Sequence, residues 1–505
     1  MKRLPWMYLV VVGLLATTGL IASAGETGAL PKDRLSQAEI ASGDVRGRDI
    51  RRQGLIVFST PFNKLDGFGD GPNGRPTMGG NGTLLRVNGL DAQSCLECHS
   101  VVRANTMPPV LGIGGAGGSN ANAIVKPSLI GLTDAGGGAT DFDGRFANPP
   151  FLFGAGGVEL AGLEMTRDLQ RLKAQAIANP GTQIELVTKG VHFGVITADA
   201  AGNVDTSGVT GVKPDLVVRP FGRKGEFATV RAFDIGAMDF HFGMQPAEVV
   251  GEGVDDDEDG VADEITAGDL SSLHIFAATL ERPYQERLSR AARRGFATFQ
   301  AIGCVECHRP SLDTQTRRLP MRLPEVEADP FANVYYQVDL GRKTPGFRRL
   351  RGGGVRVPLF SDLRRHDMGE GLRENFHEAD AEENRTFVTA RLWGVADSAP
   401  YLHDGRATTL TEAILAHGGE AQVVRDRFAD LDEDAQDELL AFLRSLRTPK
   451  EPAKDLVASL RAQERRETRR STRNWPKKHD WRDVLRSSKR GTWWPKLLKH
   501  CYGDD

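Results

Sequence analysis

The stretch "RPYQERLSRAARRGFATFQAIGCVECH", residues 282–308, joins two patterns that together indicate how this chain folds. Its apolar residues Leu288, Ala292, Phe296 and Phe299 recur at helical spacing, which predicts an amphipathic helix. The helix leads directly into the pentapeptide "CVECH". A helix that delivers two cysteines and a histidine into one tight turn is typical of a domain that attaches a cofactor covalently.

The same pentapeptide pattern occurs twice, as "CLECH" at residues 95–99 and as "CVECH" at residues 304–308. Two thiols at this spacing can each add to a vinyl group of haem, and the following imidazole can bind the iron. The alternatives are a zinc site, which needs further cysteine or histidine ligands at close spacing, and a local disulfide bond. Neither alternative requires the histidine, so we predict two covalently bound haem c groups. Their attachment residues are Cys95, Cys98, His99, Cys304, Cys307 and His308.

The two motifs predict a mainly α fold with two cytochrome c-type haem domains. Apolar stripes in residues 47–63 and 434–446 predict helices before the first motif and at the end of the second domain. Residues 181–221 alternate β-branched and polar residues between turn signals, so we expect loop and small β insertions in the first domain. The predicted units are a signal peptide (1–24), an N-terminal haem domain (25–283), a C-terminal haem domain (284–448) and a tail (449–505).

The N-terminal residues predict export to the periplasm. Lys2 and Arg3, the apolar run 8–21 and the small residues 22–24 have the order of a secretory signal peptide. The alternative is an uncleaved membrane anchor, although the apolar run is shorter than the about 20 residues that a span needs. The net charge of −3 over 505 residues gives no reason to expect a nucleic acid partner.

Two haem motifs, a long insert and "RLWGVADSAPYLHDGRATTLTEAILAHGGEA" (391–421) resemble the bacterial di-haem cytochrome c peroxidase and MauG superfamily, most closely its di-haem oxidoreductase branch. The likeness covers most of residues 45–447 and includes "DLRRHDMGEGL" (362–372). It implies an enzyme that reduces hydrogen peroxide at the N-terminal haem, with electrons from a small periplasmic cytochrome c or cupredoxin entering at the C-terminal haem. The alternatives are a MauG-like oxidase that modifies a protein or organic substrate, and a plain di-haem electron carrier.

The resemblance also implies a sixth ligand for the second iron. His417 occupies the position where a peroxidase of this superfamily has methionine, so we assign His308 and His417 to this iron. The alternative for His417 is a histidine at the negative end of a helix dipole. By the same resemblance His403 lies near the haem propionates or between the domains, and Trp393 is a core aromatic residue or an electron relay.

The sequence does not identify the acid–base residue that peroxide chemistry at the first haem requires. Met107 is a candidate sixth ligand of that haem. The weak candidates for the acid–base residue are His241, His366 and Glu164, and behind them His192 and Glu159.

The segment "GVDDDEDGVADEITAGD", residues 253–269, predicts a calcium site. Alternating aspartates before a glycine can surround one cation, but the closing glutamate of an EF-hand is replaced by Thr266, so Glu264 is a candidate to close the loop. The alternative is a solvated acidic loop. The predicted ligands are Asp255, Asp257, Asp259 and Asp263.

The tail from residue 449 onwards is basic and contains four of the six tryptophans. We predict that it is disordered, with contact to an anionic membrane surface or an acidic redox partner as alternatives. Cys501 is left over once the haem motifs have used the other four cysteines, so it is a free thiol or forms an intermolecular bridge.

Overall fold

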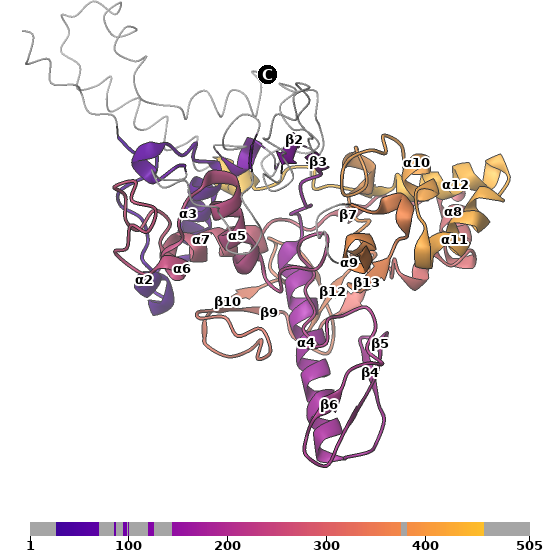
Figure 1. The fold of residues 1–505 in the computed structure, drawn as a ribbon. Coiled ribbons are helices and arrows are strands. Elements are labelled where there is room, and N and C mark those ends of the chain that lie inside the picture. Colours follow the sequence, from indigo (N-terminus) through magenta and orange to yellow (C-terminus); the bar gives the residue numbers. More distant parts are fainter. Residues whose placement is uncertain are drawn as a thin grey trace, which may run out of the picture.

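The computed structural model describes residues 27–69, 85–86, 94–97, 99, 120–125, 144–374 and 381–458. The predicted signal peptide, Cys98, Met107, Cys501 and the tail beyond residue 458 lie outside the described residues. In the described part, two groups of helices stand on either side of the long helix α4 (Ala155–Ala178) (Figure 1). Within these residues no helix combines the length and the apolar character needed to cross a bilayer.

The first helix group surrounds the crossing of two helices, α3 and α7. They approach so closely at Gly54 that a Cβ atom there would lie 2.1 Å from the Ser272 carbonyl oxygen, so only glycine fits. Phe58 and Phe276 pack beside this crossing, with ring centres 5.6 Å apart. The members are α2 (Gln37–Ser42), α3 (Gly47–Ser59), α5 (Val230–Phe242), α6 (Ala247–Val250), α7 (Ala267–Ala278) and the 3₁₀ helices η2 (Lys64–Asp66) and η3 (Cys95–Glu97).

The second helix group repeats this arrangement with α8 and α12. A Cβ atom at Gly295 would lie 1.8 Å from the Glu438 carbonyl oxygen, and Phe299 packs on Phe442 with ring centres 5.2 Å apart. The amphipathic stripes that predicted these two helices face each other in one core. The members are α8 (Arg290–Ala301), α10 (Leu410–Leu415), α11 (Gln422–Ala429), α12 (Glu433–Leu443), η6 (Cys304–Glu306), η8 (Val395–Asp397) and η9 (Gly419–Ala421).

Helix α4 forms the centre of the molecule and extends into a protruding antiparallel sheet (Figure 1). This sheet has the order β4–β5–β6, with strands at Ile184–Thr188, Val191–Ala198 and Val204–Asp205. It occupies the segment for which the alternating sequence predicted β structure. Trp393 is only 3% exposed and packs in the core around α4, with its ring centre 6.2 Å from that of Phe347.

Further short strands show that the fold is more mixed than predicted, because helices make up 38% and strands 14% of the described residues. Strands β7 (Tyr284–Gln285) and β15 (Leu446–Arg447) pair, which joins the two ends of residues 284–447. The first three strands, β1 (Leu85–Arg86), β2 (Asn120–Val125) and β3 (Gly144–Ala147), form one sheet. The remaining elements are β8 (Leu312–Asp313), β9 (Arg318–Arg322), β10 (Val334–Asp339), β11 (Arg348–Arg349), β12 (Val355–Val357), β13 (Arg365–Asp367), η7 (Glu370–Leu372), α9 (Ala381–Arg385) and β14 (Thr386–Val388).

Candidate functional site

The second cysteine motif begins where α8 ends. Gly303 has φ of +104°, a conformation that favours glycine, and it turns the chain from α8 into η6. The His308 amide then donates to the Cys304 carbonyl oxygen at 2.9 Å. This single turn brings Cys304, Cys307 and His308 together, and the two cysteines are not joined by a disulfide bond. Burial raises the pKa of Cys304 to about 12, so its side chain is a thiol at neutral pH.

The structure places His308 opposite His417, the residue that follows α10. Their ring centres are 6.4 Å apart. A metal–imidazole bond is about 2 Å long, so two imidazoles on opposite sides of one metal ion have ring centres about 6 Å apart. The spacing of this pair therefore fits one iron between the rings.

Hydrogen bonds fix which nitrogen of each ring can bind a metal. Nδ1 of His308 lies 3.2 Å from the Phe360 carbonyl oxygen, and Nδ1 of His417 lies 2.8 Å from the Ala413 carbonyl oxygen. A carbonyl oxygen only accepts, so each Nδ1 carries the proton and each Nε2 keeps its lone pair. Burial, together with the charge of His417, lowers the pKa of His308 to about 4, and burial also lowers the pKa of His417. Both rings are therefore neutral at pH 7, as metal ligands must be.

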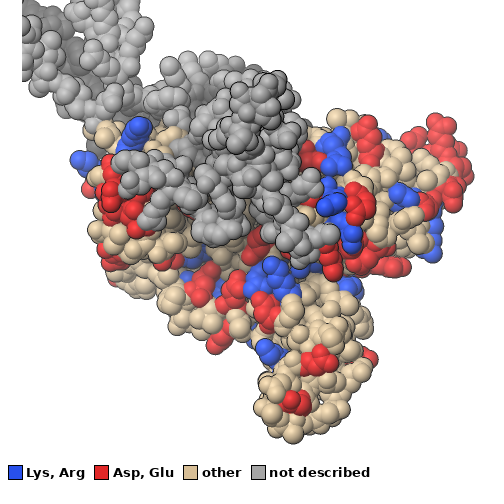
Figure 2. Space-filling view, in the orientation of Figure 1, with Lys and Arg blue, Asp and Glu red and all other residues tan. Residues whose placement is uncertain are grey.

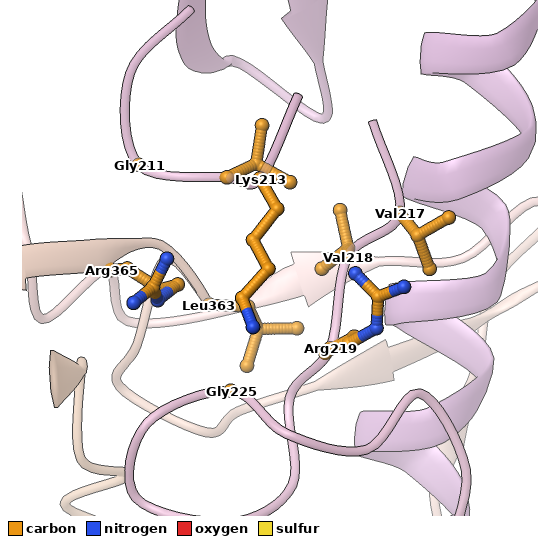
Figure 3. Close-up of a pocket in the computed structure, with 9 residues that line it drawn as sticks. Gly211, Lys213, Val217, Val218, Arg219, Gly225, Leu363 and Arg365 are labelled. Carbon is orange, nitrogen blue, oxygen red and sulfur yellow. The ribbon is translucent and has the colours of Figure 1, made fainter. Parts of the chain in front are cut away.

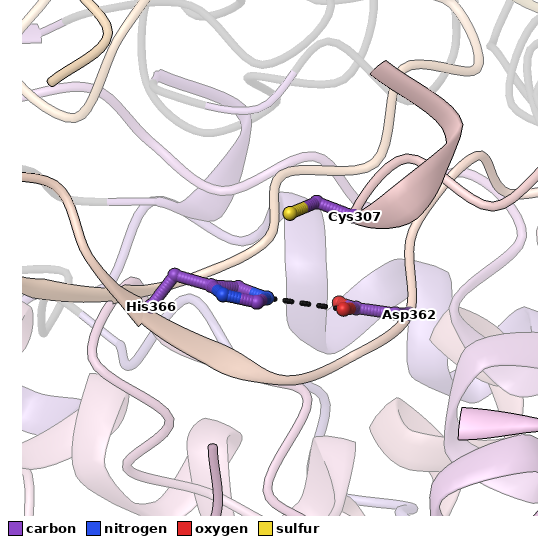
Figure 4. A group of neighbouring side chains, drawn as sticks. All are labelled: Cys307, Asp362 and His366. Atoms are coloured by element: carbon purple, nitrogen blue, oxygen red, sulfur yellow. Dashed lines mark hydrogen bonds and ion pairs between the residues drawn. The ribbon is translucent and has the colours of Figure 1, made fainter. Parts of the chain in front are cut away.

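His366 lies beside this pair, between two carboxylates and Cys307 (Figure 4). Its Nε2 is 3.0 Å from Asp362 Oδ2, and its Nδ1 is 2.7 Å from Glu420 Oε2. Burial opposes protonation, but the hydrogen bonds with Asp362 and Cys307 and the charges of these two side chains outweigh it, so the pKa of His366 rises to about 10. A ring that donates from both nitrogens has no lone pair for a metal ion or for a proton. His366 is therefore a fixed cation next to the second motif.

The first motif brings His99 into the core of the first helix group. The His99 amide donates to the Cys95 carbonyl oxygen at 2.9 Å, as in the second motif, and its ring centre lies 6.3 Å from that of Phe58. Its buried Nδ1 has no hydrogen-bond partner among the described residues. Burial, and then the charge of His241 in the last turn of α5, lower the pKa of His99 to about 3. The ring is neutral, so one of its nitrogens has a lone pair, which fits a ligand of haem iron.

Glu164 is another candidate acid–base residue and lies on α4. Its hydrogen-bond partners are other residues of the protein. Its side chain is fully buried and accepts from Lys189 Nζ at 2.5 Å and from the amides of Gln315 and Thr316 at 2.8 and 3.0 Å. These bonds connect α4 to the turn after β8. They give Glu164 a structural role.

We expect Glu164→Gln to destabilise the protein by about 3 kcal/mol, because it leaves the Lys189 ammonium buried without its counter-charge. Urea unfolding of the haem-loaded protein measures this loss. Asp313→Asn is the matched control, since its ion pair with Arg356 is exposed and contributes about 1 kcal/mol or less. A Glu164→Gln protein as stable as the control, or one with altered haem spectra, would contradict the structural assignment.

Sequence analysis did not predict most of a buried cluster that lies between α4, α5 and α7. Glu159 Oε2 lies 2.9 Å from His274 Nε2 and accepts from the Val230 amide at 3.1 Å. Glu325 completes a group whose ligand atoms lie within 4.8 Å of one another. The mostly apolar surroundings of His274 in "SSLHIFAATL" were the available sequence signal.

This cluster can hold protons in the interior. Burial opposes protonation of His274, but the charge of Glu159 outweighs it and raises the pKa of His274. Burial raises the pKa of nearby Asp234 to about 8, and its Oδ2 has no hydrogen-bond partner in the described chain. Asp234 and His241 are seven residues apart on α5, which is about 10 Å along one face of the helix. The cluster therefore reaches along α5 towards His99.

The predicted calcium ligands are brought together only in part. One carboxylate oxygen from each of Asp255, Asp257 and Asp259 lies within 4.8 Å of the others. Asp263 is not in this group; its Oδ1 accepts from the Gly253 amide at 2.8 Å. Thr266 is the N-cap residue of α7.

A small pocket between the protruding sheet and β13 is not a candidate active site. Lys213, Arg219 and Arg365 line it (Figure 3), and its volume has room for about one water molecule. No residue of either cysteine motif lines it.

Comparison with known families finds a match for the C-terminal part of the second helix group, from α10 to α12. Residues 348–446 match the sequence model of a family described as "Di-haem oxidoreductase, putative peroxidase". Over these residues the chain is similar to the di-haem oxidoreductases. This confirms the resemblance predicted from the sequence, and it supports an oxidoreductase that uses haem. No curated protein matches the chain.

Two solved structures share local similarity with the chain. Hydrazine synthase of Kuenenia stuttgartiensis is 16% identical, with 51% of this chain and 78% of that chain covered and a TM-score of 0.26. A MauG-like protein associated with microbial copper homeostasis is 15% identical, with 57% and 89% covered and a TM-score of 0.27. Scores this low carry no argument about function.

Proposed function

We propose that this chain is an exported periplasmic oxidoreductase with two covalently attached haem c groups, which reduces hydrogen peroxide at the His99 site with electrons that enter at the His308 site. The observation that carries the proposal is the pairing of His308 with His417, whose ring centres are 6.4 Å apart. His417 lies within the segment 348–446 that matches the di-haem oxidoreductases. Haem iron supplies one-electron chemistry and, where an axial position is open, a place for an oxygen substrate.

The histidine pair separates the roles of the two sites. If His308 and His417 both held one haem iron, no position on that iron would be left for substrate. Such a site is suited to electron transfer, and substrate chemistry is left to the His99 site. This arrangement supports electron entry at the second helix group.

Protons for the reaction have a source in the chain. Converting one peroxide molecule to two water molecules consumes two electrons and two protons. Asp234 and the Glu159–His274 pair hold protons in the interior at neutral pH, and α5 connects Asp234 to His241 beside His99. We assign these groups to proton supply for the His99 site.

Surface charge supports a basic electron donor. Asp and Glu side chains gather at the end of the molecule that carries α11 and α12 (Figure 2). These helices are next to the His308–His417 pair, so a small basic cytochrome c would be attracted to the electron-entry site. The exposed acidic residues there are Asp426, Asp430, Asp432, Glu433, Asp434 and Asp437.

The test is peroxide-dependent oxidation of a reduced small basic cytochrome c by the full-length two-haem protein. We expect many donor molecules to be oxidised per enzyme molecule, and the rate should fall as salt is raised because exposed charges are screened. Oxidation of no more donor than the two haems can accept would contradict the peroxidase proposal and favour a plain electron carrier.

A further inference from the structure

One stretch of chain, which includes β13, contacts both sides of the His308–His417 pair. At its start, the Phe360 carbonyl oxygen accepts from Nδ1 of His308. Near its end it meets Gly419, in the turn that follows His417. The contact is so close that a Cβ atom at Gly419 would lie 2.2 Å from the Asp367 carbonyl oxygen. The spacing of the two imidazoles therefore depends on how this stretch is fixed to that turn.

His366 links this stretch to the turn after His417. Its Nδ1 lies 2.7 Å from Glu420 Oε2, and its Nε2 lies 3.0 Å from Asp362 Oδ2 (Figure 4). The second carboxylate oxygen of Glu420 accepts from the Asp367 amide at 3.0 Å. Both partners of the His366 ring are carboxylates, which only accept, so both ring nitrogens donate. Hydrogen bonds between charged groups are the strong ones, so His366 holds the turn firmly.

The same ring also lies beside the turn of the second cysteine motif. One ring nitrogen of His366 lies within 4.8 Å of Cys307 Sγ, next to His308 in the chain. Helix α10, which leads to His417, has only six residues, and a helix this short depends on packing for its position. His366 therefore contacts the turn of one histidine and, through Glu420, the turn of the other.

We propose that His366 is a positioning residue for the second iron, and that its bond with Glu420 holds His417 in place opposite His308. This inference rests on the proposed function, because it requires the second haem. His366 has no lone pair left for the iron, so it acts through His417 and not as a ligand. Without the bond to Glu420, His417 should leave the iron more often and expose the axial position that it fills.

The experiment measures how fast carbon monoxide binds to the reduced full-length two-haem protein. Carbon monoxide reaches the second iron only after His417 has left it, so one slow phase reports this dissociation. The His417→Ala variant identifies the phase, because the phase becomes fast when the ligand is removed. Glu420→Ala should speed it about tenfold or more, since a bond between charged groups is lost. Glu370→Ala is the matched control, because Glu370 is a similarly exposed glutamate that pairs with Arg385, and it should leave the rate unchanged.

Two amide variants separate positioning from a merely structural role. The side-chain nitrogen of asparagine is as many bonds from Cα as Nδ1 of histidine, and that of glutamine is as many as Nε2. His366→Asn should therefore keep the bond to Glu420 and the slow rate. His366→Gln should keep only the bond to Asp362 and speed the phase about tenfold. A merely structural role would lower the melting temperature of both variants and leave their rates equal.

The outcomes distinguish this inference from the proposed function. A slow phase that becomes fast in His417→Ala but is unchanged in Glu420→Ala would overturn the role of His366 alone, as would equal rates in the two amide variants. Carbon monoxide binding that is unaffected by His417→Ala would overturn the histidine pair and this inference together. None of these readouts depends on peroxide turnover.

Discussion

Replacing His417 with alanine should convert the iron at the second motif from low-spin to high-spin. The structure offers His417 Nε2 as the donor opposite His308, and no change in the fold is required to remove it. Loss of one strong-field imidazole leaves an open or water-filled axial position. The optical spectrum of the ferric variant should gain a high-spin component that accounts for one of the two haems, and added imidazole should reverse this change.

His403→Ala is the matched control for this experiment. His403 lies in the same segment, but its ring stacks on Phe387 with centres 4.7 Å apart, and its Nε2 is 3.9 Å from Glu374 Oε2. It should therefore leave the low-spin signal unchanged. An unaltered spectrum in His417→Ala, or the same change in both variants, would show that His417 is not the ligand.

Replacing Cys304 and Cys307 with serine should reduce covalently bound haem from two groups per chain to one. A hydroxyl group cannot form the thioether bond to a haem vinyl group, and the motif of residues 95–99 is untouched. The pyridine haemochrome assay and the mass of the denatured chain measure this change directly.

Cys501→Ser controls for the loss of a thiol as such, because Cys501 lies outside both motifs. This variant should keep both haem groups. Two covalent haems on the Cys304→Ser, Cys307→Ser protein would contradict attachment at the second motif, and none on the wild type would contradict attachment altogether.

Local sequence patterns predicted the elements whose partners are close in the chain or whose apolar stripe is strong. The stripes of α8 and α12 are visible because buried residues recur every three or four positions. The β4–β6 sheet was visible because its strands follow one another with short turns. Strand β8 has only two residues and pairs with β12, which lies far along the chain, so no local pattern could predict it.

The same reasoning explains which site residues could be found. The cysteine motifs are compact, and the position of His417 came from the family resemblance. Glu159 pairs with His274, which is 115 residues away on another helix. The sequence around Glu159 therefore could not predict this pair. Glu164 and His366 were predicted as candidate acid–base residues, and the sequence could not show the buried partners that each of them has. Asp263 matched the spacing of a calcium loop, but the fold turns its carboxylate to Gly253.

The most direct test of the central claim is the low-temperature EPR spectrum of the full-length ferric protein with both haems bound, repeated after one-electron reduction. The account predicts one low-spin signal from the iron between His308 and His417 and one high-spin signal from the iron on His99. Two high-spin signals would contradict the histidine pair. Two low-spin signals that persist after one-electron reduction would contradict an open site at His99.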